Sequence, residues 1–265
     1  MAQVLRDGTC SLFRFAEEQG LIPLDKSPAK RLPNHYHGEP RDRALTIAEI
    51  VALLPLLNNP ESPLPLGFYG RMNLLLTLAT GARSGELLKL RWSDVDRDAG
   101  VFSIRSELGK SGRTRQLPIS AFTAEILDRL EETRQSDVLF PGGNDPNVPL
   151  RQLAVAVGVR RFFPKRGRDK VPQPHMGLSP FTPHDLRRTA RTHWQRLGIS
   201  ELVGESLLGH SLGSKIFLTY ATHNFADEQR QALDAWSTEL YRLRDGAGAD
   251  AANVVSIASR RAIKV

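Results

Sequence analysis

A small set of arginine, lysine, histidine and tyrosine residues, each in its own local motif, could together act on a phosphodiester. Arginine and lysine offset phosphoryl charge, histidine moves protons, and a tyrosine hydroxyl can attack phosphorus. In chain order the candidates are Arg83, Lys110, His184, Arg187, His210 and Tyr220. Their order and motifs predict metal-free cleavage and rejoining of a phosphodiester by a tyrosine nucleophile.

The segment FTPHDLRRT predicts the start of a helix that presents two of these side chains. Thr182 is a suitable N-cap, Pro183 suits the first helical position, and Asp185 completes a Thr-x-x-Asp capping box. His184 and Arg187 are three residues apart, so they share a face near the helix N-terminus, which favours anions. The alternative is a capped surface helix with solvated charges.

Two further candidates sit on predicted turns. Arg83 follows Gly81, a residue suited to ending a helix, and Glu86 could support its guanidinium or be a plain helix glutamate. Lys110 lies in a predicted hairpin turn, from which an ammonium could protonate a leaving oxygen. Solvated turn residues are the alternative for both.

His210 and Tyr220 complete the set. Gly209 lets the backbone turn and present His210, and Tyr220 follows the apolar run from 216 to 218. Because an unperturbed tyrosine has a pKa of about 10, a nucleophilic role requires proton removal and a stabilised pentavalent phosphorus. The alternative is a tyrosine in the core.

Helical patterns dominate the elements that must position these residues. Thr46 and Glu49 form a predicted capping box, with Leu45 and Ile50 as a hydrophobic staple. Helices are predicted at 47–57, 67–80, 85–90, 121–134, from Pro183, at 201–208 and at 227–243.

Three short β-like runs, at 92–96, 101–106 and 115–119, predict a small sheet with a tight turn at 109–112. Residues 140–149 read as a loop. The basic stretch 151–170 leads into a region where proline and glycine, from Pro164 to Gly177, argue against regular structure. The predicted fold class is mainly α with a small three-stranded antiparallel sheet, that is, α+β.

Composition points to an anionic partner. The 265 residues include 36 Lys and Arg against 29 Asp and Glu, a formal net charge of +7, and nucleic acid is the commonest partner for such a balance. Cys10 is the single cysteine, which excludes an intramolecular disulfide and a four-cysteine zinc site. The longest apolar run is too short to span a bilayer, so a cytoplasmic protein without a membrane partner is expected.

Four motifs in order resemble the tyrosine recombinase, or phage integrase, family. TGARSGELLKLRWSDVD resembles its first arginine box, LGKSGRTRQLPI its lysine-bearing hairpin, and HDLRRT its His-x-x-Arg box. LLGHS, followed ten residues later by Tyr220, resembles its final box. The resemblance covers roughly Leu45 to Leu243 and implies that family's catalytic-domain fold.

The resemblance also implies roles. Tyr220 would form a 3′-phosphotyrosine, Arg83 and Arg187 would hold the non-bridging oxygens, and Lys110 would protonate the leaving oxygen. His184 would assist proton transfer at the tyrosine, and His210 would donate to the phosphate. DNA-binding residues are expected at Arg113, Arg115, Arg160, Arg161, Lys165 and Arg188.

The implied partners are double-stranded DNA, further copies of the chain in a tetramer on DNA, and accessory DNA-bending proteins. No cofactor and no metal are implied. The expected location is the cytoplasm, in association with the nucleoid.

The expected domains are a remnant of a core-binding domain at 1–43, the catalytic domain at 44–244 and a flexible tail at 245–265. The remnant would comprise one amphipathic helix at 4–21, with Leu12, Phe13, Phe15 and Ala16 on its apolar side, and a linker. The chain therefore looks truncated relative to the family. Two alternatives stay open: an inactive DNA-binding remnant of an integrase, and a type IB topoisomerase-like enzyme that relaxes DNA.

Overall fold

The computed structural model describes residues 2–23, 26–32, 42–108, 114–166, 171–209 and 225–246. Three candidate catalytic residues, Lys110, His210 and Tyr220, lie outside the described residues, as does Arg113. The chain forms two compact units, Met1–Asp42 and Arg43–Val265, which are described separately.

The first unit contains helix α1 (Ala2–Glu18) and the 3-10 helix η1 (Pro28–Arg31). Arg6 donates to the Leu32 carbonyl oxygen at 3.3 Å, and Ala29 is buried. Leu12 and Phe15 are 65% and 56% exposed, so the described residues of this unit leave part of the apolar side of α1 uncovered. The described helix begins and ends earlier than the range expected from sequence.

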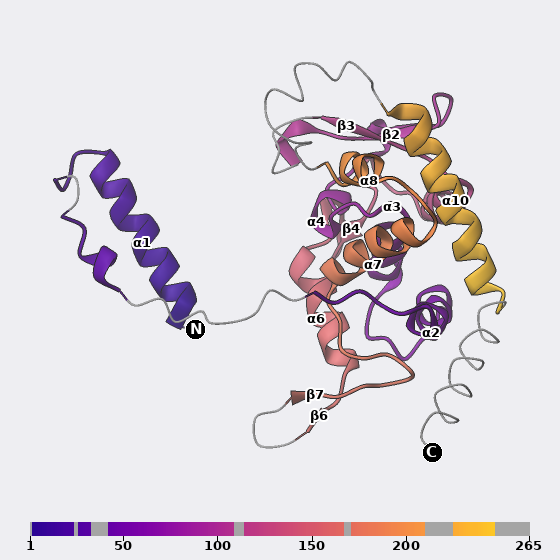
Figure 1. Ribbon diagram of the computed structural model, residues 1–265, viewed down its shortest axis with the longest axis horizontal. Helices are drawn as coiled ribbons and strands as arrows, with labels where there is room; N and C mark the ends of the chain where they lie inside the picture. The colour runs from indigo at the N-terminus through magenta and orange to yellow at the C-terminus, as the bar shows by residue number, and fades with distance from the viewer. Residues whose placement is uncertain are drawn as a thin grey trace, which may run out of the picture. The chain divides into compact units, whose positions relative to one another are not determined.

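The second unit is mainly helical (Figure 1). Thr46 and Glu49 form the predicted capping box at the start of α2, and Gly81 ends α3 with a left-handed φ of 65°. The described helices are α2 (Ile47–Asn58), α3 (Phe68–Thr80), α4 (Ser84–Leu87), α5 (Ala121–Glu131), α6 (Gln152–Phe162), α7 (Pro183–Arg196), α8 (Glu201–Leu208) and α10 (Ala226–Arg244), with 3-10 turns η2 (Trp92–Asp94) and η3 (Ser106–Leu108).

The predicted three-stranded antiparallel sheet is present. Its strands are β1 (Val95–Asp96), β2 (Val101–Ile104) and β3 (Arg115–Pro118), in the order β1-β2-β3. The register pairs Val95 with Phe102 and Phe102 with Leu117. The predicted fold class, mainly α with a small antiparallel sheet, is confirmed.

Some local expectations were wrong. Residues 92–94 form η2 rather than a strand. The backbone N–H of Asp94 donates to the Arg91 carbonyl oxygen at 3.0 Å, and this bond closes a helical turn. The expected loop at 140–149 contains a hairpin of β4 (Pro141–Gly142) and β5 (Asp145–Pro149). A second short hairpin pairs β6 (Lys165–Arg166) with β7 (Val171–Pro172), where irregular structure was expected.

Helix α6 lies within the basic stretch and was not predicted. Val155, Val159 and Phe162 are buried, and their spacing of four and three residues places them on one helix face. Arg160 and Arg161 are exposed in its last turn. The helix therefore packs through a narrow apolar stripe and turns its basic residues to solvent.

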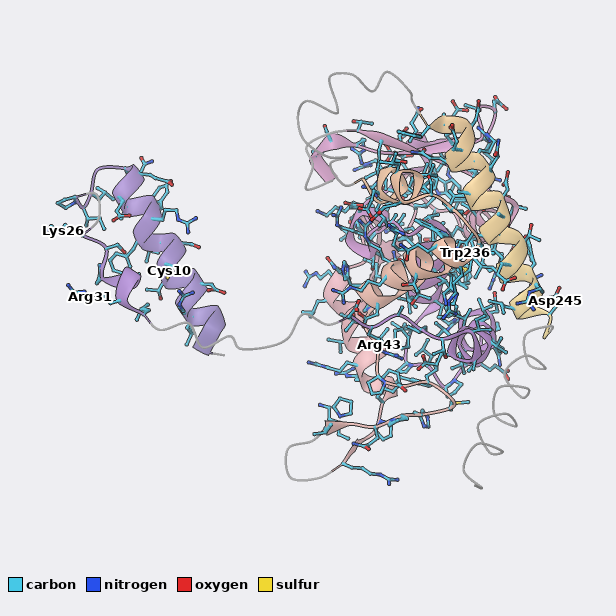
Figure 2. All side chains as sticks on the ribbon, viewed as in Figure 1. Cys10, Lys26, Arg31, Arg43, Trp236 and Asp245 are labelled. Carbon is cyan, nitrogen blue, oxygen red and sulfur yellow. The ribbon has the colours of Figure 1, made fainter. Side chains whose placement is uncertain are left out.

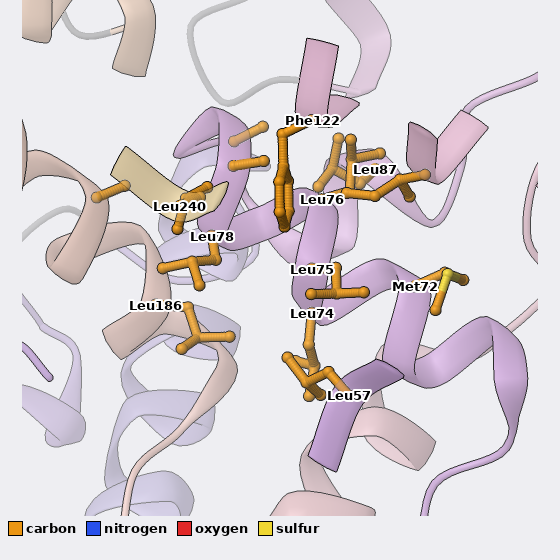
Figure 3. Close-up of a cluster of buried hydrophobic side chains, with 14 of the residues drawn as sticks. Leu57, Met72, Leu74, Leu75, Leu76, Leu78, Leu87, Phe122, Leu186 and Leu240 are labelled. Atoms are coloured by element: carbon orange, nitrogen blue, oxygen red, sulfur yellow. The ribbon is translucent and has the colours of Figure 1, made fainter. Parts of the chain in front are cut away.

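Helix α3 forms the centre of the core. Every residue from Gly70 to Thr80 is buried, as expected for a helix packed on all sides. Figure 3 shows its leucines beside Leu57 of α2, Phe122 of α5, Leu186 of α7 and Leu240 of α10. Trp236 of α10, labelled in Figure 2, is buried and donates from Nε1 to the Leu78 carbonyl oxygen at 2.9 Å.

Helix α3 is apolar, but none of the described helices is both long enough and apolar enough to cross a membrane.

Candidate active site

Arg83 is held at the entrance of α4, just after α3 ends. The left-handed turn at Gly81 fits against Trp194, whose ring occupies the space that a Cβ would need. Arg83 is the N-cap of α4, and its Nη1 lies 2.7 Å from Oε1 of Glu86. The ion pair considered from sequence is therefore present.

Glu86 bridges two arginines. Its side chain is 3% exposed, and its second oxygen, Oε2, lies 2.7 Å from Nη2 of Arg115 on β3. Both carboxylate oxygens thus accept charge-assisted hydrogen bonds, which are the strong kind. This arrangement fixes the guanidinium groups of Arg83 and Arg115 on either side of one buried carboxylate.

Arg187 lies in the second turn of α7 and is 3% exposed. Nη1 donates to the Gly81 carbonyl oxygen and Nη2 to the Leu208 carbonyl oxygen, each at 2.8 Å. Burial lowers the pKa of the Arg187 guanidinium, and repulsion by Arg83 and Arg115 lowers it further, to about 9. The group stays protonated at neutral pH, but an anion nearby would stabilise it.

His184 lies in the first turn of α7, where Asp185 accepts from the backbone N–H of Thr182 at 2.8 Å as the capping box predicts. The imidazole and Arg83 both line a cleft of about 480 Å³, whose other lining residues are Ser84, Gly85, Glu86, Lys89, Gln152, Ala156, Thr182 and Pro183. Partial desolvation there, followed by the positive charges of Arg188 and Arg187, lowers the pKa of His184 below its ordinary value. Although His184 keeps an exposed surface, this shift in pKa favours the neutral imidazole, which is the form that can accept a proton.

The residues expected to bind DNA occupy two kinds of environment. Arg160, Arg161 and Lys165 are exposed at the end of α6 and on β6. Arg188 is 36% exposed and pairs with Asp185 at 3.3 Å. Arg115 is 12% exposed and lies within the network around Glu86.

Of the predicted catalytic residues that the structure describes, Arg83, His184 and Arg187 are brought together. The sequence analysis placed Arg115 among the DNA-binding residues and not in this group. Its position on a predicted strand, five residues after Lys110, is the one feature of the sequence that could have indicated a place near the site. The resulting site gathers three guanidinium groups near the buried Glu86 carboxylate, a composition suited to a phosphoryl group. Across the residues that the structure covers, no cluster of His, Cys, Asp and Glu suited to a metal ion occurs.

Residues 43–227 match the phage integrase family, and the chain belongs to that family. It is 30% identical over 224 residues to tyrosine recombinase XerC of Roseiflexus sp. (strain RS-1), a match covering 80% of this chain and 66% of the relative. It is 29% identical to XerC of Xylella fastidiosa (strain 9a5c), over 71% of this chain and 60% of the relative. The chain thus spans about two thirds or less of these two relatives.

Solved integrase structures share the fold. A lambda integrase (75–356) dimer bound to a COC′ core site superposes with a TM-score of 0.55 at 23% identity, covering 79% of this chain and 71% of that one. The integrase from mycobacterium phage Brujita gives a TM-score of 0.54 at 16% identity, covering 88% and 70%.

Proposed function

We propose that this chain cleaves and rejoins double-stranded DNA as a site-specific tyrosine recombinase, through a covalent 3′-phosphotyrosine. The observation that carries the proposal is the grouping of Arg83, Arg115 and Arg187 around Glu86, with the lowered pKa of Arg187. Like charges held together in a buried site raise its free energy, and a bound phosphodiester would lower it. Membership of the phage integrase family supports the same conclusion.

In this mechanism Tyr220 attacks the scissile phosphorus, the P–O5′ bond breaks, and the DNA 5′-hydroxyl leaves with a proton from Lys110. His184, as the neutral imidazole, takes the tyrosine proton. Arg83 and Arg187 stabilise the pentavalent intermediate, while His210 donates a hydrogen bond to the phosphate. The assignments for Lys110, His210 and Tyr220 rest on sequence motifs. The covalent bond conserves the cleavage energy for rejoining, so the mechanism needs no metal or cofactor.

We expect DNA also to be contacted by Arg188 on α7, by Arg160 and Arg161 at the end of α6 and by Lys165 on β6. Arg113, which lies outside the described residues, is kept as a DNA contact on sequence grounds. Solved relatives include a lambda integrase tetramer bound to a Holliday junction. We extend that assembly to this chain, acting on DNA in the cytoplasm beside the nucleoid, with DNA-bending proteins as accessories.

A nicked suicide substrate tests the proposal, because loss of the short strand beyond the nick prevents rejoining and traps the adduct. Denaturing gels should show protein joined to the DNA 3′ end, with the same yield in EDTA. Tyr220→Phe should abolish the adduct. An adduct that survives this substitution, or that forms only with Mg²⁺, would show the proposed chemistry to be wrong.

The same preparation distinguishes recombination from DNA relaxation. Two duplexes carrying one cognate site each should exchange strands, whereas a topoisomerase-like enzyme would relax supercoiled DNA without pairing duplexes. Strand exchange by Tyr220→Phe would contradict the assignment of the nucleophile.

A further inference from the structure

We infer that Arg115 is a positioning residue, which joins the Arg83–Glu86 pair to the turn where α8 ends and the chain leads into His210. The inference rests on the proposed function, because it assigns a task within that site. It replaces the expectation that Arg115 contacts DNA directly.

The first step is burial. At 12% exposure Arg115 presents little surface, and Nη2 is engaged by Glu86 at 2.7 Å. Burial lowers the pKa of Arg115, and the Glu86 carboxylate opposes that effect. Arg187 is more buried still, so burial alone does not separate the two roles. What distinguishes Arg115 is its ion pair with the buried Glu86 carboxylate, which holds the guanidinium in place.

The second step is the contact with α8. Nη1 of Arg115 donates to the Leu208 carbonyl oxygen at 3.3 Å, and the same oxygen accepts from Arg187 at 2.8 Å. Carbonyls in the last turn of a helix have no partner within the helix, and the helix dipole makes that end negative. The carbonyl oxygen at the end of α8 can therefore accept hydrogen bonds from two guanidinium groups.

The third step is the fit at Gly209. This residue has a left-handed φ of 67°, and a Cβ there would overlap the Arg115 guanidinium. Gly209 is thus required both by its backbone conformation and by the approach of Arg115. The position of Arg115 therefore fixes the backbone at Gly209, the residue that precedes His210 in the sequence.

Arg115 also links two candidate catalytic segments of the sequence. It lies on β3, five positions after Lys110, while Glu86 belongs to the α4 segment that begins at Arg83. The Arg115 side chain consequently joins β3, the first arginine motif and the end of α8.

The test compares Arg115→Gln and Arg115→Lys with Arg97→Gln, a matched control at an exposed ion pair after β1. Single-turnover cleavage is measured at saturating DNA, and DNA affinity is measured separately. Arg115→Gln should slow cleavage by about tenfold or more with little change in Kd, because the phosphate-binding groups are misplaced rather than removed. Arg115→Lys, which keeps the charge but cannot reach both partners, should recover part of the rate.

The opposite pattern overturns the inference. If Arg115→Gln weakens DNA binding but cleaves at the parent rate once saturated, Arg115 is a DNA contact. Equal cleavage and equal affinity in the parent and in both Arg115 variants would remove any such role.

Hydrogen exchange provides a readout that does not depend on catalysis. The Gly209 amide donates to the Ser206 carbonyl oxygen at 3.0 Å. In Arg115→Gln it should exchange faster than in the parent, whereas the amide of Gly204, earlier in α8, should be unchanged. Should Arg115→Gln fail to fold, Arg115→Lys gives the same comparison. Unchanged exchange at Gly209 overturns the inference, and failure of the parent to trap DNA bears on the proposed function alone.

Discussion

The Arg187 guanidinium donates to the carbonyl oxygen of Gly81 at 2.8 Å, across 106 positions of sequence. That carbonyl belongs to the residue that ends α3, and the second acceptor, Leu208, is the last residue of α8. Helix C-termini carry partial negative charge, which offsets part of the cost of burying a cation. The arginine proposed to bind phosphate therefore also joins two helix ends.

Replacing Arg187 should affect both stability and cleavage. Arg187→Met removes the guanidinium donor to the Gly81 carbonyl oxygen and the shorter of two such bonds to Leu208, which keeps its bond from Arg115. The expected cost is about 1–3 kcal/mol in the free energy of unfolding. Cleavage should fall by about a hundredfold or more because a donor to the phosphate is removed. Urea unfolding and single-turnover cleavage measure the two effects, with Arg196→Met, at an exposed position on the same helix, as the control. An Arg187→Met protein as stable as the parent would contradict the predicted contribution of Arg187 to stability.

The lowered pKa of His184 sets the expected acid limb of cleavage. An imidazole that accepts the tyrosine proton must be neutral, so activity falls as pH drops through its pKa. Because desolvation and Arg188 lower that pKa, the midpoint of kcat/KM should lie below the ordinary histidine value of about 6.5. A pH–rate profile at subsaturating DNA measures it, and His184→Gln should lose this limb. A midpoint above 7 in the parent would contradict the assignment.

His193 should make stability depend on pH. Its ring is 4% exposed, stacks on Trp236 with 5.7 Å between centroids, and places Nε2 3.0 Å from the Leu45 carbonyl oxygen. Burial lowers the pKa of His193 in the folded state. Protonation then favours unfolding, so its contribution is complete above the unfolded pKa of about 6.5 and is lost as pH falls through the folded value.

Urea unfolding between pH 8 and pH 5 tests this against His193→Gln. The parent should lose more unfolding free energy than the variant over that interval, because the carboxylates common to both cancel in the difference. Parallel pH profiles would mean that His193 titrates alike in the folded and unfolded states.

The exposed basic residues of α6 and β6 should contribute to DNA binding by neutralising phosphates. Changing Arg160, Arg161 and Lys165 together to glutamine should reduce the slope of log Kd against log salt by about 0.9 for each phosphate that is no longer neutralised. Arg97, Arg134 and Arg242, changed together to glutamine, remove the same charge from other elements. If both triple variants shift the slope equally, general charge rather than direct phosphate binding explains the effect.

Local signals predicted the fold well. The capping boxes at Thr46 and Thr182 and the glycine that ends α3 depend on residues a few positions apart, and each appears in the structure. Helix α6 was missed because its three-residue apolar stripe is embedded among basic residues whose charge dominates the pattern. The hairpin at 141–149 was missed because proline, glycine and asparagine are common to loops and short turns.

The site was less accessible from sequence. From the sequence, Arg115 is only a basic residue on a predicted strand, and the neighbouring residues do not indicate the direction of its side chain. Its partners, Glu86 and Leu208, are 29 and 93 positions away, so tertiary packing decides its environment. Glu86 itself was visible as a possible partner of Arg83 because those two lie within one turn.

The double use of Glu86 constrains how this site changes over generations. Losing the carboxylate would leave two guanidinium groups without their acceptor, while losing Arg115 would leave a buried oxygen without its donor. A protein with only one of these two substitutions is less stable than the parent, so a substitution at one position favours a substitution at the other. Positions 86 and 115 should accordingly covary among homologues, and a recombinase lineage that abandons the acidic residue should abandon the arginine with it.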